Sequence, residues 1–196
     1  MSFSAEQKKE IIEHTYKSAC CRRSLLSGIL FAKGRVDGKT VSMSFDRYEY
    51  ADYTSTLVHE FYGKEGEIYR LSKGGRSITI SFASPSAAKY IHEIDNLSGG
   101  FDLCDIITQR CASCLSSFLR GVFLACGRLS DPKKQFSLEF TLGNRAEKFK
   151  KILEDLSLSP LISNKKTGDI VYFHKGDEIE SFYGHAGLNR VVFYII

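Results

Sequence analysis

The sequence predicts an α+β fold in which one αββαββα unit occurs twice, with a mostly antiparallel sheet that carries its helices on one face. Three observations support this prediction. One part of the chain resembles another, short segments alternate apolar and polar residues as half-buried strands do, and glycine-containing turns separate those segments. Of 196 residues, 43% are apolar and 26% are charged, which is typical of folded globular proteins and argues against disorder.

The internal repeat is the strongest signal. Residues 20–36 read CCRRSLLSGILFAKGRV and residues 113–129 read SCLSSFLRGVFLACGRL, with seven of the seventeen positions identical. Farther on, Val41–Phe45 matches Phe136–Phe140. We therefore expect a first repeat over residues 1–98 and a second over residues 103–196, joined near Ser98-Gly99-Gly100.

In the first repeat, Ser4 is expected to cap a lead-in helix, and residues 20–33 form an apolar helix that Gly34 ends as its C′ residue. Asp37-Gly38 is a strong hairpin signal, and Val41, Met43 and Phe45 alternate with Thr40, Ser42 and Ser44 in the returning strand. The later elements are a helix at Arg47–Tyr62, strands at Glu67–Leu71 and Ser77–Phe82, and a helix from Ser84-Pro85 to about Asp95.

The second repeat is expected to follow the same order. Its elements are a lead-in at Asp102–Thr108, a helix at Arg110–Cys126, a hairpin of Leu129 with Gln135–Leu142, a helix at Arg145–Leu156 that Asn144 caps, strands at Leu161–Ser163 and Asp169–Phe173, and a helix at Asp177–His185. The eight strands are expected to form one pseudo-two-fold sheet.

The two apolar repeat helices carry small residues at matching places. Gly28 and Ala32 lie one turn apart in the first helix, as do Gly121 and Ala125 in the second. Small residues at this spacing allow two helix backbones to approach closely. We therefore expect these four residues to form the interface between the repeat helices, although ordinary helix packing also accommodates small residues.

These helices resemble the LAGLIDADG helix of homing endonucleases, here Leu26–Gly34 and Leu119–Gly127, and the αββαββα order is also that of the family. The resemblance implies a saddle-shaped sheet that holds DNA. In the family an acidic residue before the last glycine of each helix binds the catalytic metals, but here Lys33 and Cys126 stand at those positions. A lysine 4 Å from a divalent ion is repelled by roughly 8 kcal/mol at an effective dielectric of about 20. Because thiols are also poor Mg²⁺ ligands, we expect no enzymatic cleavage.

Longer stretches resemble the WhiA regulators of sporulation and cell division. They are the opening Met1–Ser4, Cys20–Arg23, and Phe118–Lys133. The resemblance implies a noncatalytic DNA-binding domain of a bacterial transcription regulator. The resemblance implies a C-terminal helix-turn-helix domain, which the sequence up to Ile196 does not include, and the second repeat reads Ser113-Cys114 where the family has paired cysteines. We expect that a helix-turn-helix was removed or is naturally absent, and that DNA binding by this domain alone is weak.

Candidate DNA contacts are the cations at the ends of the predicted hairpins and repeat helices. They are Lys33, Arg35, Lys39, Arg76, Arg128, Lys133, Lys134, Lys165 and Lys166. Outward hydroxyl and amide side chains of the strands, including Gln135, Ser137 and Thr141, would support base or phosphate contacts. Solvated lysines in turns are also common, and Glu139 together with a net charge of only +4 leaves open an alternative function as a protein-interaction scaffold.

Metal and membrane functions are not expected. Cys111-x-x-Cys114 with Cys104 could hold a metal, but Cys20 and Cys21 are adjacent, which is poor ligand spacing, and the five histidines are scattered. We therefore expect no cofactor. We expect no signal peptide, because the N-terminus is polar from its start, and Leu25–Ala32 and Val191–Ile196 are too short to span a bilayer. We expect a cytoplasmic, nucleoid-associated monomer whose partners are double-stranded DNA and proteins of transcription or cell division.

Overall fold

The computed structural model describes residues 3–63, 68–73, 77–98, 101, 106–107, 110–130, 136–166 and 168–188. The helices are α1 (Phe3–Glu13), α2 (Ala19–Lys33), α3 (Tyr48–Tyr62), α4 (Pro85–Asn96), α6 (Ser113–Cys126), α7 (Ala146–Asp155) and α8 (Gly176–Ala186), with a 3-10 turn η1 (Gly143–Arg145). The strands are β1 (Arg35–Asp37), β2 (Thr40–Phe45), β3 (Ile68–Lys73), β4 (Ser77–Ala83), β5 (Gly127–Leu129), β6 (Leu138–Thr141), β7 (Leu161–Ser163) and β8 (Ile170–Phe173). Among these helices, none has both the length and the apolar character needed to cross a membrane.

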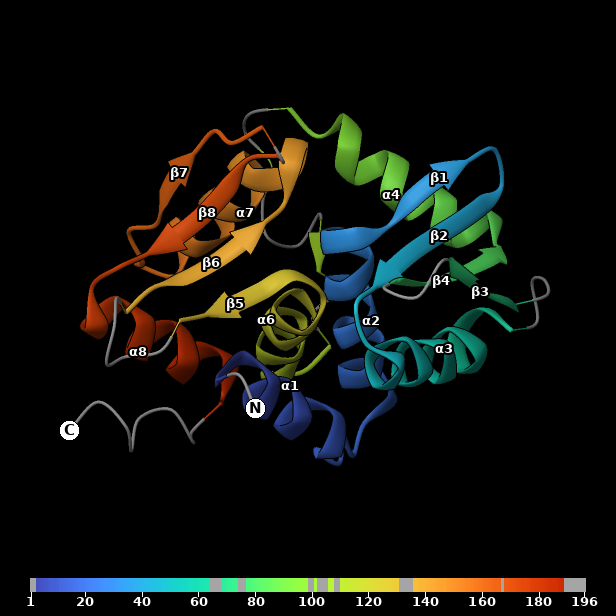
Figure 1. Cartoon of the computed structure of the whole chain (residues 1–196), viewed down its shortest axis with the longest axis horizontal. Helices are drawn as coiled ribbons and strands as arrows, with labels where there is room; N and C mark the ends of the chain where they lie inside the picture. Colours follow the sequence, from blue (N-terminus) through green and yellow to red (C-terminus); the bar gives the residue numbers. More distant parts are fainter. Residues whose placement is uncertain are drawn as a thin grey trace.

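The strands form two antiparallel sheets of four, which confirms the α+β class. Their orders are β1-β2-β4-β3 and β5-β6-β8-β7, so both sheets have the same connectivity. The expectation of one continuous sheet is wrong. In Figure 1, α2 and α6 stand in the centre with one sheet on either side, and the inner strands β1 and β5 each pair with one neighbour. The helix pair therefore occupies the place where the two inner strands would have met.

Alternation in β2 correctly predicts its two faces. Val41, Met43 and Phe45 are buried, whereas Thr40 and Ser44 are exposed. The register pairs Ser42 with Ser81 and Ser44 with Thr79 of β4, so hydroxyl side chains line the outward face of both strands. The apolar side chains on the opposite face contact the helices.

Of the three residues predicted to cap helices, one does so and two do not. Ser84 caps α4, since the N–H of Ala87 donates to Ser84 Oγ at 3.0 Å. Ser4 lies inside α1 instead of capping it, and its hydroxyl bonds to the N–H (2.7 Å) and the carbonyl (3.0 Å) of Leu129 in β5. Asn144 lies within η1 and caps nothing. The prediction for Ser4 fails because its partner is 125 residues away in the chain.

Gly34 and Gly127 end the two central helices for reasons of space. Both are C-cap residues with extended backbone, φ −63° and −65°, so the expectation of a C′ glycine at position 34 is wrong. A Cβ atom on Gly34 would lie 2.7 Å from Ile91 Cδ1, and one on Gly127 would lie 2.3 Å from Phe123 Cδ2. Each helix therefore passes directly into a strand through a gap that admits no side chain.

The contact between α2 and α6 depends on two glycines. A Cβ atom on Gly28 would lie 2.2 Å from Phe118 O, and one on Gly121 would lie 2.1 Å from Leu25 O. Both obstacles are backbone atoms of the facing helix. Across the same contact, the Ser24 hydroxyl donates to Cys114 O at 2.6 Å. The two helix backbones therefore lie closer than any side chain at these positions would permit.

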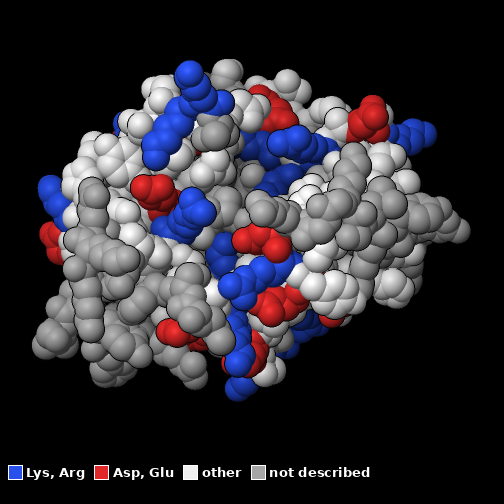
Figure 2. All heavy atoms as spheres, in the orientation of Figure 1, with Lys and Arg blue, Asp and Glu red and all other residues white. Residues whose placement is uncertain are grey.

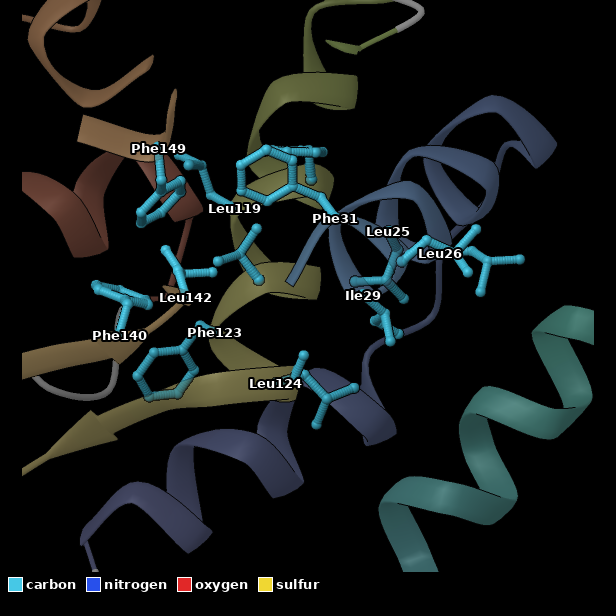
Figure 3. Close-up of a cluster of buried hydrophobic side chains, with 14 of the residues drawn as sticks. Leu25, Leu26, Ile29, Phe31, Leu119, Phe123, Leu124, Phe140, Leu142 and Phe149 are labelled. Atoms are coloured by element: carbon cyan, nitrogen blue, oxygen red, sulfur yellow. The ribbon is translucent and has the colours of Figure 1, made fainter. Parts of the chain in front are cut away.

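Aromatic side chains join the helix pair to the second sheet (Figure 3). Phe31 of α2 meets Phe118 of α6 edge-on at 5.5 Å between ring centroids and Phe149 of α7 at 6.1 Å. Phe149 in turn packs on Phe140 of β6 at 5.0 Å. All four rings are fully buried. One hydrophobic core therefore continues from the first half of the chain into the second, and it fixes the two sheets relative to the helix pair.

Replacing Gly28 with alanine is expected to lower the free energy of unfolding by about 1–3 kcal/mol, the range for overpacked sites. The new methyl group would overlap Phe118 O, a backbone atom that cannot rotate away. This cost exceeds the roughly 1 kcal/mol that alanine contributes to a helix interior relative to glycine. Denaturant unfolding monitored by circular dichroism measures the change.

Gly184 in α8 provides the matched control. A Cβ atom there meets nothing within 4 Å, so Gly184→Ala is expected to stabilise the protein by the propensity difference alone. Stabilisation of similar size in both variants would contradict close backbone contact between α2 and α6.

Candidate nucleic-acid interface

A groove of about 1010 Å³ lies where the C-terminal ends of α2 and α6 meet β1 and β5. Both halves of the chain contribute to its wall, and α1 adds Lys8. Figure 2 shows lysine and arginine side chains gathered along the middle of this face, in and beside the hollow, with fewer acidic side chains among them. The lining cations are Lys8, Lys33, Arg35, Arg47, Arg128 and Arg145, and the lining carboxylates are Asp46 and Asp95.

Lys33 lies at the end of α2 on the floor of this groove. Its Nζ donates to Ser44 O at 2.6 Å and stands 5.2 Å from the centroid of the Phe45 ring. Burial lowers the pKa of Lys33, although neighbouring Asp46 acts in the opposite direction. The Lys33 side chain is therefore held by β2, and its ammonium group is incompletely solvated. An ammonium group in this state is stabilised when an anion binds to it.

Lys8 is the most desolvated lysine of the groove. Its side chain is buried, and its Nζ lies 5.4 Å from the Tyr50 ring and 6.0 Å from the Phe123 ring. Burial lowers its pKa to about 8; the nearby charges of Lys33 and Arg128 act in the same direction, whereas Asp46 acts against them. No described carboxylate forms an ion pair with Lys8. A phosphate entering the groove would relieve this repulsion.

Cys126 occupies the position in α6 that corresponds to Lys33 in α2. Its Sγ donates to Val122 O at 3.4 Å, and burial raises its pKa to about 12, so the thiol is neutral at physiological pH. In the described residues, no group of His, Cys, Asp or Glu in the groove is close enough to hold a metal ion. The two helix ends therefore offer an ammonium and a neutral thiol.

Arg145 also lines the groove, but its charge is already paired. Its Nε and Nη2 donate to the two carboxylate oxygens of Asp95 at 2.7 and 2.9 Å, and its Nη1 donates to Leu30 O and Phe31 O at 3.2 and 2.8 Å. Arg145 is buried, with only 7% of the residue exposed. This arginine of the second half therefore holds the end of α2 and the end of α4, and it is a structural clamp.

Polar side chains extend from the groove along the outward face of the first sheet. Ser42 and Ser44 line the groove, and Ser44 Oγ lies 2.8 Å from Thr79 Oγ1 on the next strand. Hydroxyl groups of this kind bond equally well to phosphates, bases and bridging waters.

The second sheet presents a more mixed face. Arg128 pairs in register with Glu139, which pairs with Tyr172. The rings of Tyr172 and His174 are in contact, with centroids 5.5 Å apart, as expected if they share this face. Arg128 is exposed, and its cation stands beside a carboxylate-bearing strand, so this half is less positive than the groove floor.

Of the nine predicted cations, Lys33, Arg35 and Arg128 come together in the groove. Lys39, Lys165 and Lys166 are exposed at turns and do not line it. Arg76, Lys133 and Lys134 lie outside the described residues, as do Gln135 and most of the predicted lead-in at Asp102–Thr108. Sequence reasoning missed Lys8 and Arg47; Lys8 lies in a helix whose side-chain directions become clear only when that helix is docked.

Three comparisons with known proteins agree with one another. Residues 115–194 match the model of the WhiA LAGLIDADG-like domain. A probable cell division protein WhiA from Caldicellulosiruptor saccharolyticus is 24% identical over 98% of this chain and 64% of its own length. The chain thus spans less than two thirds of that curated relative.

Solved structures show the same fold. The N-terminal LAGLIDADG domain of DUF199/WhiA superposes with a TM-score of 0.70 at 20% identity, covering 98% of this chain and 96% of that one. The homing endonuclease I-DmoI, in complex with DNA and Mn, superposes with a TM-score of 0.55 at 14% identity, covering 88% of this chain and 98% of that one. The chain therefore has the LAGLIDADG homing-endonuclease-like fold, and along nearly all of its length it is similar to the WhiA proteins.

Proposed function

We propose that this chain is a noncatalytic DNA-binding domain of a bacterial transcription regulator that acts in sporulation or cell division, and that two repeats, at residues 1–98 and 103–196, form its binding face. One observation carries the proposal: cations that form no ion pair with any described residue line the groove between the two sheets. They are Lys8, Lys33, Arg35 and Arg128. A location at the nucleoid follows from this function.

The groove favours a polyanion over a metal ion. Metal-assisted phosphodiester cleavage requires hard oxygen ligands close to the scissile phosphate. At the ends of α2 and α6 stand Lys33, which would repel a divalent ion, and Cys126, which is protonated. The same lysine would attract a backbone phosphate directly. We infer that the central groove binds DNA and leaves it intact.

The proposed contacts divide into two kinds. The cations on the groove floor would neutralise phosphates near the centre of the duplex, which fixes position and orientation but reads no sequence. The outward hydroxyl groups of β2 and β4 would face a groove of the DNA on one side of that centre. Among the predicted cations, Lys39, Arg76, Lys133, Lys134, Lys165 and Lys166 are proposed as peripheral phosphate contacts.

Equilibrium binding to a fluorescent 30-base-pair duplex, followed by anisotropy, tests this proposal. Lys33→Gln and Arg128→Gln are each expected to weaken binding by about tenfold, the equivalent of one charge-assisted hydrogen bond. Lys150→Gln is the matched control, because Lys150 pairs with Glu154 on the exposed side of α7, away from the groove. Equal affinity of all three variants and the wild type would contradict a binding site in the groove.

The absence of cleavage is tested separately. Supercoiled plasmid incubated with the protein and Mg²⁺ or Mn²⁺ is expected to remain supercoiled. Nicking that a single substitution at Lys33 abolishes would overturn the noncatalytic assignment.

A second function, a scaffold for protein partners, is favoured by one observation. Glu139 lies between Arg128 and Tyr172 on the face that would meet DNA, where a carboxylate opposes phosphate binding. If the scaffold function holds, Glu139→Gln leaves DNA affinity unchanged. If the DNA-binding function holds, this substitution strengthens binding, because it removes a repulsive charge.

A further inference from the structure

Four cysteines meet at the end of the helix pair opposite to the groove. Cys20 and Cys21 lie in the first turn of α2, Cys114 lies in the first turn of α6, and Cys111 lies two residues before the start of α6. All four sulfur atoms lie within 4.8 Å of one another. Two of them come from the first half of the chain and two from the second, about 90 residues apart.

The sulfur atoms are spaced as four ligands of one metal ion would be. Cys111 Sγ lies 3.6 Å from Cys20 Sγ, 3.5 Å from Cys21 Sγ and 3.6 Å from Cys114 Sγ. A zinc ion holds thiolates at about 2.3 Å in a tetrahedron, whose sulfur–sulfur edge is then about 3.8 Å. A disulfide would require about 2.0 Å between two of these atoms. In a [2Fe–2S] cluster two cysteines bind each iron, and in a [4Fe–4S] cluster each cysteine binds a different iron, so in both cases some of the sulfur atoms would stand farther apart than one tetrahedral edge.

The surroundings favour thiolates at this place. The N-terminal ends of α2 and α6 both carry the partial positive charge of a helix dipole, which stabilises anionic sulfur. Ser18 Oγ lies 3.2 Å from Cys20 Sγ, as an outer hydrogen-bond donor to a metal-bound thiolate would. The N–H of Cys114 donates to Cys111 O at 3.1 Å, and this turn directs both sulfur atoms of Cys111-x-x-Cys114 to one side.

The pattern of burial also suits a metal site. Cys21 and Cys114 are buried, Cys20 is half-buried and Cys111 is exposed, so the cluster is closed on the protein side and accessible from solvent. Arg22 and Arg23 follow the first cysteine pair, at the helix end that disfavours cations. Four thiolates around one divalent ion carry a net charge of −2; because Arg22 is already paired with Glu60 at 2.8 Å, Arg23 is the arginine left to offset part of it.

We propose that Cys20, Cys21, Cys111 and Cys114 bind one Zn²⁺ ion, which fastens the N-terminal ends of α2 and α6 together. The sequence expectation of no metal rested on the poor spacing of adjacent cysteines within one segment. The fold removes that objection, because it supplies the second pair of ligands from the other half of the chain. The inference does not depend on the proposed DNA binding.

Metal analysis of the whole chain, purified under reducing conditions and reconstituted with Zn²⁺, tests the site. One zinc per chain is expected, and Cys111→Ser should reduce retained zinc at least tenfold after dialysis. Cys126→Ser is the matched control, since Cys126 lies in the groove and outside the cluster, and it should retain one zinc per chain. Reconstitution that leaves the wild type without stoichiometric zinc would overturn the proposal.

Two further measurements do not depend on any variant. Co²⁺ in place of Zn²⁺ should give the intense visible absorption of tetrahedral sulfur coordination, and chelation of the metal should lower the Tm without preventing refolding when zinc is restored. Weak absorption typical of octahedral oxygen coordination would contradict the site. So would the isolation of iron in place of zinc, or of a disulfide within the cluster, detected by the mass of the alkylated, unreduced protein.

Discussion

Replacing Arg145 with methionine is expected to lower the free energy of unfolding by about 3–5 kcal/mol, as is typical when one partner of a buried ion pair is removed. The loss has two sources. Asp95 would keep its charge without a partner, and the carbonyls of Leu30 and Phe31 at the end of α2 would lose the guanidinium that bonds to them. Methionine fills similar volume, so a cavity contributes little.

The matched control is Lys150→Met, which removes a partner from an exposed i,i+4 ion pair with Glu154 and should change stability by less than about 0.5 kcal/mol. Urea unfolding of both variants measures the difference. Equal effects of the two substitutions would show that Arg145 does not join the halves of the chain.

The ion pair between Arg145 and Asp95 also makes the stability of the protein depend on pH. The Arg145 guanidinium holds the pKa of Asp95 below its usual value of 3.8. A carboxylate whose pKa is lowered by folding contributes stability that is present above pH 4 and is lost as the pH falls through the folded-state value. In Arg145→Met this contribution should vanish, so the variant should show a shallower loss of stability between pH 4 and pH 2.

Replacing Lys8 with methionine is expected to stabilise the free protein and to weaken DNA binding. Folding lowers the pKa of Lys8 from 10.5 to about 8, and a difference of this size corresponds to roughly 3 kcal/mol at pH 7. Because the charged form is the one that burial disfavours, the penalty is present below pH 8 and is relieved as the pH rises from about 8 to 10.5. The stabilisation by methionine should therefore be largest near neutral pH and small above pH 10.5.

Thermal unfolding at pH 7 and pH 10.5, together with duplex binding at pH 7 and pH 9, measures both effects. Wild-type affinity should fall between pH 7 and pH 9 as Lys8 loses its proton, whereas Lys8→Met should bind weakly with little pH dependence. A lower Tm for Lys8→Met at pH 7 would show that Lys8 is a structural residue and not a charge retained for a ligand.

Much of the fold was predictable because its signals are local. Alternation in Thr40–Phe45, the turn at Gly38 and the cap at Ser84 each depend on residues within a few positions of one another. The repeat helices were predictable because the chain carries their pattern twice, and the close contact at Gly28 and Gly121 follows from small residues on matching faces.

Features that join distant segments were not predictable in this way. The hydroxyl of Ser4 bonds to a strand of the second half, Arg145 reaches back to α2, and two cysteine pairs meet only when the helices pack. The location of Lys8 in the groove was not predictable for the same reason, because it depends on how α1 packs against distant segments. Lys33, Arg35 and Arg128 were predicted as candidate site residues because they sit at the ends of the repeated helices, where the pattern itself gives their position.

The most direct test of the account is the salt dependence of duplex binding. If Lys8, Lys33, Arg35 and Arg128 neutralise backbone phosphates, these four residues alone should contribute about −3 to −4 to the slope of log Kobs against log salt, at close to 0.9 per contact, and each peripheral phosphate contact should make the slope steeper. Arg128→Gln should reduce the magnitude of this slope by about 1. A wild-type slope close to zero would contradict an electrostatic DNA interface in the groove.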